Sequence, residues 1–190
     1  MLDWLKNINK EHPEFWKEYL AKFSKKTHRY VILSTEATGD SIEKDVITYI
    51  SEPLEEEMEI AGPIKLILFV SSSALDTDFC AKICDMRPNG ESYNLQAGFI
   101  RMRYRESLHM PLLIEPGKIY RLEILLRSVA HAFFKNHRIQ LQITSCDFPV
   151  HDRNLNTGKS SELSTEIEVA HQTLYTGGQY PSHLILPKLK

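Results

Sequence analysis

The hydrophobic pattern of the sequence changes near residue 45, and this change constrains the fold more than any other feature. Before that point, aromatic and aliphatic residues recur at the three- and four-residue spacings of a helix. After it, short segments with an apolar residue at every second position are separated by turn-forming residues. Such spacing is typical of β-sandwiches and barrels. We therefore expect a mainly β protein, a jelly-roll β-sandwich, with a short N-terminal helix-plus-strand appendage.

The appendage is expected to cover residues 1–44, and the sandwich domain residues 45–190. Pro13 suits the first turn of a helix, where its missing N–H is not needed. One face of that helix would be strongly aromatic, with Phe15, Trp16, Tyr19, Leu20 and Phe23. Residues 30–33 then indicate a short buried strand, and the chain turns at Gly39.

Within residues 45–190 we expect short strands and no long helix. The expected strands are 45–50, 64–70, 77–86, 92–104, 120–126, 139–143 and one that contains Ile167 and Val169. The dipeptide Asn89-Gly90 predicts a hairpin between two of them, because both residues tolerate positive φ. Alternation along 77–86 predicts that Phe79, Ala81 and Ile83 share one face and that Cys80, Lys82 and Cys84 share the other.

The charge balance and the cysteines exclude several classes of protein. The chain has 190 residues, 23 basic and 25 acidic, so its net charge of -2 gives no general attraction to nucleic acid or anionic lipid. No segment approaches the roughly 18 consecutive apolar residues of a membrane helix, and the first residues lack a signal-peptide pattern. Cys80, Cys84 and Cys146 have no C-x-x-C spacing and suit a reducing compartment. We expect a cytoplasmic protein with no nucleic-acid partner and no membrane partner.

Common catalytic motifs are missing from the sequence. Residues 39–43 and 90–94 begin a G-x-S-x-G pattern at Ser41 and Ser92, but both lack its last glycine. The sequence has no H-E-x-x-H motif and no glycine-rich phosphate loop. Its eight histidines are scattered, with no i,i+2 or i,i+4 pair that could hold a metal from one element. We predict no catalytic, no cofactor-binding and no metal-binding residue, and no cofactor.

Two polar clusters could still carry a function. Asp76 and Asp78 could hold a divalent cation, or they could belong to a turn in which they accept backbone N–H bonds; we favour the turn. Arg101, Arg103 and Arg105 alternate along one expected strand. They could form a basic stripe for an acidic partner, but we favour a solvated face of a sheet.

A third polar cluster is the loop over residues 151–158, which is rich in turn-forming residues. A buried network between Asp152 and Arg153 would order this loop. A functional role for the loop is the less favoured alternative.

Several segments of residues 45–190 follow one another in an order shared with a known family. They are 49–54, 76–85, 92–95, 101–107, 137–139, 148–149, 152–158, 170–173 and 182–187. This series closely resembles the C-terminal domain of the cocaine esterase/Xaa-Pro dipeptidyl-peptidase (CocE/NonD) family of serine hydrolases. One departure is Asn136, where the family usually has a glycine before the His-Arg pair.

The resemblance implies a galactose-binding-like jelly roll that packs beside an α/β-hydrolase domain and helps to shape its active-site cleft. The catalytic serine, aspartate and histidine of the family all lie in the hydrolase domain, to which no part of this sequence corresponds. No catalytic residue can therefore be transferred to this chain. His171 and His183 lie inside family motifs, and we expect them to be structural.

The N-terminal segment resembles a different family. Residues 30–39 are similar to the first strand and Exo I motif of 3′–5′ exonucleases like the DNA polymerase III epsilon subunit, in which an Asp-x-Glu pair binds two metals. Glu36 matches the glutamate, but Ser34 stands where the aspartate belongs. A neutral hydroxyl cannot replace a carboxylate that bridges two cations, so we expect no nuclease activity.

Together these features predict a fusion of an exonuclease-like fragment with an accessory β-sandwich of an acyl hydrolase, acting as a noncatalytic interaction module. One alternative is a subunit or fragment of a serine hydrolase that needs a catalytic domain in trans; another is a carbohydrate-binding module. A sandwich separated from its hydrolase domain would expose apolar area. We expect that area to be covered by the aromatic helix face, by a homodimer or by an α/β-hydrolase domain.

Overall fold

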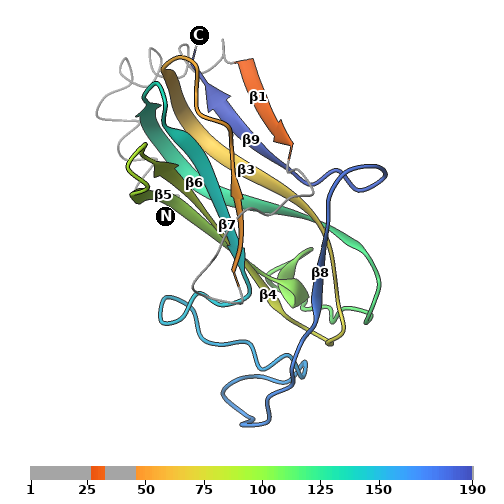
Figure 1. Cartoon of the computed structure of the whole chain (residues 1–190). Helices are drawn as coiled ribbons and strands as arrows, with labels where there is room; N and C mark the ends of the chain where they lie inside the picture. The colour runs from red at the N-terminus through yellow and green to blue at the C-terminus, as the bar shows by residue number, and fades with distance from the viewer. Residues whose placement is uncertain (1–26, 33–45, 190) are drawn as a thin grey trace, which may run out of the picture.

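The computed structural model describes residues 27–32 and 46–189, which form two antiparallel β-sheets (Figure 1). The elements are β1 (Thr27–Ile32), β2 (Val46–Ile50), β3 (Met58–Ser72), β4 (Asp78–Met86), β5 (Ser92–Arg101), the short 3-10 helix η1 (Met102–Tyr104), β6 (Tyr120–Phe133), β7 (Arg138–Thr144), β8 (Gln172–Tyr175) and β9 (His183–Lys188). The described part contains no α-helix. The expectation of a mainly β sandwich is confirmed.

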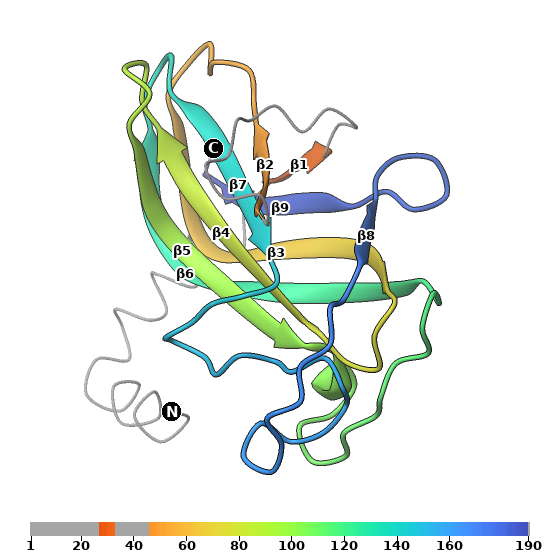
Figure 2. The same cartoon turned by 60° about the horizontal axis from the view of Figure 1, so that its bottom comes forward.

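The strand order of the first sheet is β1-β9-β3-β6, and β8 pairs with β3 outside this path. The second sheet has the order β2-β7-β4-β5. Figures 1 and 2 show that the loop after η1 and the long segment between β7 and β8 gather at the same end of the sandwich. We call this end the loop end.

The core lies between the two sheets and is built from side chains at alternate positions of the strands. Its buried members include Ile64, Leu66, Leu68, Phe79, Ala81, Ile83, Leu122, Ile124, Leu126, Leu141 and Ile143. Each large aliphatic side chain removed from water contributes about 1.5–3 kcal/mol. The predicted inward face of β4 is confirmed, but Cys80 and Cys84 on its other face are buried as well. The ion pair of Lys82 with Asp147, at 3.9 Å, brings the segment after β7 over that outer face.

Strands β5 and β6 approach each other closely where the two sheets meet. An ideal Cβ on Gly98 would lie 2.8 Å from both Ile124 Cγ2 and the Leu125 carbonyl oxygen. Nearby, Gln96 Nε2 donates a hydrogen bond to the Ser128 carbonyl oxygen at 3.2 Å. The absence of a side chain at Gly98 therefore allows the sandwich to close along this edge.

The predicted hairpin at Asn89-Gly90 joins β4 to β5. Gly90 donates its N–H to the Arg87 carbonyl oxygen at 2.9 Å, and Arg87 donates to the Glu91 carbonyl oxygen at 2.8 Å. Only Gly90 of the dipeptide has a positive φ, at 88°. Asn89 contributes differently, because its Oδ1 accepts the Glu91 N–H at 3.1 Å.

Asn136, the position where the resembled family usually has glycine, has a φ of 67°. Its N–H donates to the Leu54 carbonyl oxygen at 2.9 Å, which fixes the turn between β6 and β7. Left-handed backbone is easiest for glycine, and asparagine tolerates it better than most other residues. The substitution therefore preserves the turn.

Two expectations for the strands are wrong. No strand contains Ile167 and Val169, which are 64% and 81% exposed, and the chain instead forms β8 beside β3 at residues 172–175. The expected strand 92–104 ends at Arg101 and continues as η1. Alternation alone could not find these limits, because a strand also needs a neighbour with free backbone groups.

The expected helix with its aromatic face, including Trp16 and Tyr19, lies outside the described residues. The expected strand near residues 30–33 corresponds to β1, which pairs with β9 and so belongs to a sheet of the sandwich. The division between residues 44 and 45 stays a prediction.

Candidate functional site

Two buried aspartates hold two arginines at the loop end of the sandwich. Asp78 and Arg101 are opposite each other in the register of β4 and β5. Arg101 Nε and Nη2 donate to the two carboxylate oxygens of Asp78 at 2.9 and 3.0 Å. Arg103 donates its backbone N–H to Asp76 Oδ1 at 2.8 Å and its Nε to Asp76 Oδ2 at 2.6 Å. Such two-pronged, charge-assisted bonds fix both partners firmly.

The expectation that these arginines form a solvated stripe is wrong. The side chains of Arg101 and Arg103 are only 17% and 14% exposed. Because the strand ends at Arg101, the following turn directs Arg103 to Asp76 instead of continuing the alternation. Arg105 is also engaged, since its Nη1 donates to the carbonyl oxygens of Met102 and Leu112.

The loop over residues 151–158 is tied to the two aspartates by a single amide group. Asn154 Nδ2 donates to Asp76 Oδ2 at 2.9 Å and to Asp78 Oδ1 at 2.7 Å. Its Oδ1 accepts the backbone N–H of Asn156 at 3.0 Å, so the same side chain also shapes the following turn. No pattern in the sequence indicates this role of Asn154, because its partners lie more than seventy positions earlier.

The predicted partner of Asp152 is wrong. Its carboxylate pairs with Arg101 at 3.2 Å, and its carbonyl oxygen accepts a second bond from Arg101 Nη2 at 2.9 Å. Arg153 is exposed and makes no hydrogen bond or ion pair with another described residue. Arg101, and not Arg153, therefore pairs with Asp152 and joins the 151–158 loop to β5.

The two buried carboxylates, Asp76 and Asp78, are each paired with an arginine. Burial raises the pKa of Asp78, while hydrogen bonds from Arg101 and Asn154 act against that effect. The Asp78 carboxylate in turn raises the pKa of Arg101. A guanidinium stays protonated in proteins. Its positive charge beside Asp78 stabilises the ionised carboxylate, so we treat the two groups as an ion pair at neutral pH. The Ser161 hydroxyl and Arg101 lower the pKa of the exposed Asp152.

The alternative expectation for Asp76 and Asp78 is a site for a divalent cation, which would need carboxylate oxygens as ligands. Each of their four carboxylate oxygens accepts at least one N–H hydrogen bond from Arg101, Arg103 or Asn154. Asp76 accepts one backbone N–H, as expected, but that N–H belongs to the distant Arg103, and Asp78 is the first residue of β4 and not part of a turn. Within residues 27–32 and 46–189, no group of three or more His, Cys, Asp or Glu residues is arranged to hold a metal ion.

Five histidines of the described residues make hydrogen bonds or ring contacts within the sandwich. His131 Nε2 and His137 Nδ1 lie 3.0 and 2.8 Å from the two oxygens of the buried Asp85. His151 stacks on Phe99, with ring centroids 3.9 Å apart. The His183 ring bonds to the Pro181 carbonyl oxygen, and the His171 backbone N–H donates to Ser73 Oγ. Sequence reasoning did not find the Asp85 cluster, because its members come from separate elements.

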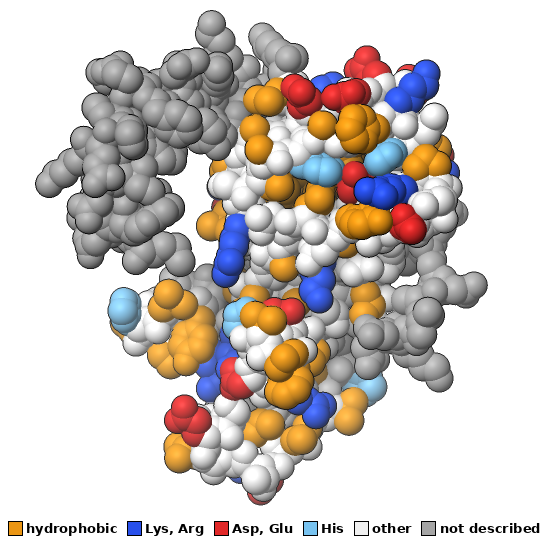
Figure 3. Space-filling model, turned by 90° about the vertical axis from the view of Figure 1, so that its left-hand side faces the viewer, with side chains coloured by type: hydrophobic (Ala, Val, Ile, Leu, Met, Phe, Trp, Pro, Cys, Tyr) orange, Lys and Arg blue, Asp and Glu red, His pale blue; other side chains and the backbone are white. Residues whose placement is uncertain are grey.

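The loop end exposes many large apolar side chains, which we call the loop-end apolar surface. It comprises Leu108, Met110, Leu112 and Leu113 after η1, and Phe148, Val150, Leu163, Ile167 and Val169 between β7 and β8. The two segments touch, because a Cβ on Gly158 would lie 3.1 Å from Leu113 Cδ1. Figure 3 shows hydrophobic side chains distributed over both the upper and the lower part of one face, among Lys, Arg and His.

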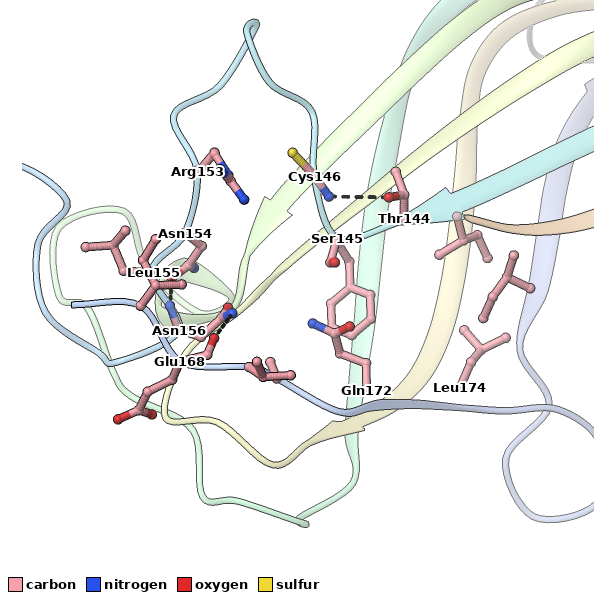
Figure 4. Close-up of a pocket in the computed structure, with 16 residues that line it drawn as sticks. Thr144, Ser145, Cys146, Arg153, Asn154, Leu155, Asn156, Glu168, Gln172 and Leu174 are labelled. Carbon is pink, nitrogen blue, oxygen red and sulfur yellow. Dashed lines mark hydrogen bonds between the residues drawn. The ribbon is translucent and has the colours of Figure 1, made fainter. Parts of the chain in front are cut away.

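A cavity of ≈ 560 Å³ opens next to this surface, between the ends of β2 and β7 and the segment that leads into β8 (Figure 4). Ile47, Phe79, Ile143 and Leu174 provide apolar walls, and polar groups line the side nearer the 151–158 loop. Figure 4 shows the Arg153 side chain directed toward the cavity and the Glu168 carboxylate directed away from it.

One side of the cavity is held by hydrogen bonds. Asn156 Nδ2 donates to the Glu168 carbonyl oxygen at 2.9 Å, and Gln172 Nε2 donates to the Thr77 hydroxyl. The first bond ties the 151–158 loop to the segment that leads into β8, and the second ties β8 to the residue before β4. Within the described ranges, no helix is long and apolar enough to cross a membrane.

The described part of the chain is an antiparallel β-sandwich domain, with a buried polar network and exposed apolar side chains at its loop end. The chain belongs to the family of X-Pro dipeptidyl-peptidase C-terminal non-catalytic domains, whose family model matches residues 8–185. It is thus a domain of the CocE/Xaa-Pro peptidase-like hydrolases, as the resemblance implied.

The chain is similar to parts of larger hydrolases. It is 43% identical over 148 residues to the cocaine esterase of Rhodococcus sp. (strain MB1 Bresler), covering 77% of this chain and 26% of that protein. An aminopeptidase from a marine sediment Thaumarchaeota archaeon superposes with a TM-score of 0.75 and 29% identity, over 83% of this chain and 28% of the other. An α-amino acid ester hydrolase gives a TM-score of 0.72 and 28% identity, over 78% and 26%. The chain thus spans about a quarter of the length of each relative.

Proposed function

We propose that this chain is the accessory β-sandwich of an acyl hydrolase that cleaves esters or Xaa-Pro peptides, and that it docks on an α/β-hydrolase domain through the loop-end apolar surface. The observation that carries the proposal is the clustering of exposed apolar side chains on two loops at one end. Monomeric proteins rarely leave large apolar patches in water, and such patches mark interfaces. Interfaces between domains of one chain bury about 600–1,500 Å².

The buried polar network supports this role. Loops with few regular hydrogen bonds are normally mobile, yet Arg101 and Asn154 tie the 151–158 loop to β5 and β4. In the loop after η1, the Leu112 N–H donates to the Arg103 carbonyl oxygen at 2.8 Å. A docking surface that is held in one conformation loses less entropy when its partner binds. The network therefore serves the interface by positioning it.

A second copy of this chain is the alternative partner that would cover the loop-end apolar surface, so we keep a homodimer as the alternative proposal. The exonuclease-like origin of residues 1–44 and a cytoplasmic location stay predictions, and we propose no nuclease activity, because Ser34 stands in place of a metal-binding aspartate.

The test combines the purified chain with the α/β-hydrolase domain of the Rhodococcus relative, produced without its own C-terminal domain. We expect no turnover of p-nitrophenyl esters or Xaa-Pro amides by the chain alone, and association with a gain of turnover in the mixture. The double variant Leu108→Glu/Leu163→Glu, at two exposed positions, should abolish association.

The matched control is Phe134→Glu, at an exposed position just after β6, in the turn that leads to β7, which should associate like the native chain. Equal association of all three proteins would contradict docking through the loop end. A native dimer that the double variant dissociates, measured by light scattering without any hydrolase domain, would favour the homodimer instead.

A further inference from the structure

We propose that the cavity between β7, β8 and the 151–158 loop binds an organic monocarboxylate with an apolar body, whose carboxylate pairs with Arg153. The cavity shares Ile167 and Val169 with the loop-end apolar surface, but neither Leu108 nor Leu163, the two positions changed in the docking test, lines it. It would operate in the chain alone, so it does not depend on the proposed function.

The size and walls of the cavity suit a small ligand with an apolar part. Its ≈ 560 Å³ lies within the range of about 300–1,000 Å³ found for small-molecule sites. Phe79 and Ile143 are almost fully buried in the core but present part of their surface to the cavity. Leu174 and Ile47 complete an apolar side that is open to solvent and would gain from being covered.

The charges around the cavity select an anion. Arg101 and Arg103 also lie near the loop, but each is neutralised by a bound aspartate. Arg153 makes no ion pair with a described residue and points toward the cavity (Figure 4), so its positive charge is available to a ligand. The one carboxylate in the cavity lining, Glu168, is directed away from it (Figure 4).

Hydrogen-bond donors add to this selection. Ser145 lines the same cavity, and its hydroxyl makes no hydrogen bond with another described residue. A guanidinium and a hydroxyl can share the two oxygens of one carboxylate. A phosphate ester or nucleotide would call for several available cations, whereas Arg153 supplies a single charge.

The backbone that carries these groups is held before any ligand arrives. Asn154, adjacent to Arg153, donates hydrogen bonds to Asp76 and Asp78. Ser145 lies between Thr144 and Cys146, and the Cys146 backbone N–H donates to the Thr144 hydroxyl at 3.4 Å. A prearranged site loses little conformational entropy on binding. The geometry therefore favours a binding site over an incidental gap between loops.

The experiment is a titration of the full chain with hexanoate and with 1-hexanol, followed by the backbone amide signals in NMR spectra. Both probes have the same alkyl chain and differ in the charged group. We expect hexanoate to bind about fivefold more tightly, which corresponds to the upper range of about 1 kcal/mol for an exposed ion pair. The signals of Ser145, Ala170 and Gln172 should move.

Three variants make the result specific. Arg153→Gln should remove the preference for hexanoate, while Arg121→Gln, at an exposed arginine on the outer face of β6, should keep it. Val169→Asp, at a strongly exposed position of the cavity lining, should weaken hexanoate but not 1-hexanol. Equal affinities for both probes, an unchanged preference in Arg153→Gln, or shifts away from the cavity would each overturn the proposal, as would no binding of either probe.

Discussion

Asp78 and Arg101 face each other across β4 and β5 and share two hydrogen bonds of 2.9 and 3.0 Å. The carboxylate is almost completely buried, while the guanidinium continues outward to Asp152. The pair therefore links the sandwich to the long segment between β7 and β8, which carries part of the loop-end apolar surface.

Replacing Arg101 by Gln should destabilise the fold by about 3–5 kcal/mol, because it leaves the buried Asp78 carboxylate without its partner. The free energy of unfolding in urea measures this effect. The matched control is Lys65→Gln, which removes a half-exposed pair with Glu123 and should cost less than about 1 kcal/mol. Equal losses in the two variants would contradict a structural role for the Asp78–Arg101 pair.

The buried thiol of Cys80 predicts a loss of stability at high pH. Burial raises the pKa of this thiol from 9.0 to about 12. The unfolded chain therefore releases the proton at lower pH than the folded chain, and stability falls as the pH rises from 9 toward 12. Urea unfolding at several pH values should give a shallower fall for Cys80→Ala than for the native chain; parallel curves would contradict the assignment.

The same burial predicts selective alkylation. At pH 8, iodoacetamide should label the exposed Cys146 and leave Cys80 and Cys84 unmodified until urea unfolds the chain. Mass spectrometry of the peptides measures the extent at each cysteine. Modification of all three at similar rates under native conditions would show that the outer face of β4 is open.

Adding a methyl group at the contact between the sheets should be destabilising. Gly98→Ala places a Cβ 2.8 Å from Ile124 Cγ2 and from a backbone oxygen, so the strands must move apart at a cost of about 1–3 kcal/mol. Gly117→Ala is the comparison: it meets no atom within 4 Å but has a φ of 80°. Its cost should be the backbone strain of about 1–2 kcal/mol, without the broadened NMR signals at Ile124 and Leu125 that Gly98→Ala should cause.

The left-handed backbone at Asn136 gives a prediction for the turn between β6 and β7. Asn136→Ala should lower the free energy of unfolding by about 1 kcal/mol, because alanine fits a φ of 67° poorly. Asn136→Gly should restore or exceed the native value. Thermal unfolding of the three proteins checks this order, and a more stable alanine variant would exclude strain at this position.

Local patterns predicted those parts of the fold that depend on local chemistry. Alternation identified the inward face of β4, and Asn89-Gly90 identified its hairpin, because pleating and turn geometry act over a few residues. Ile167 and Val169 alternate in the same way but have no neighbouring strand, so the pattern predicted a strand that does not form.

The candidate site was harder to predict, because its contacts join distant parts of the sequence. Arg101 and Arg103 carried the pattern of a solvated face, and only their meeting with Asp76 and Asp78 made them buried. The interaction of Asn154 with both carboxylates has no counterpart in residue spacing. Sequence resemblance identified these segments as family motifs without stating what each side chain does.

The two bonds from the Asn154 amide have a consequence for how this domain can vary. One side-chain nitrogen fixes the chain next to Arg153 and, through Asn156 and Glu168, the segment that carries Ile167 and Val169. The cavity and the part of the loop-end apolar surface that contains Ile167 and Val169 therefore share this attachment to β4. Lengthening that side chain by one methylene, as in Asn154→Gln, would shift both together, so the proposed ligand binding and the proposed docking would change together.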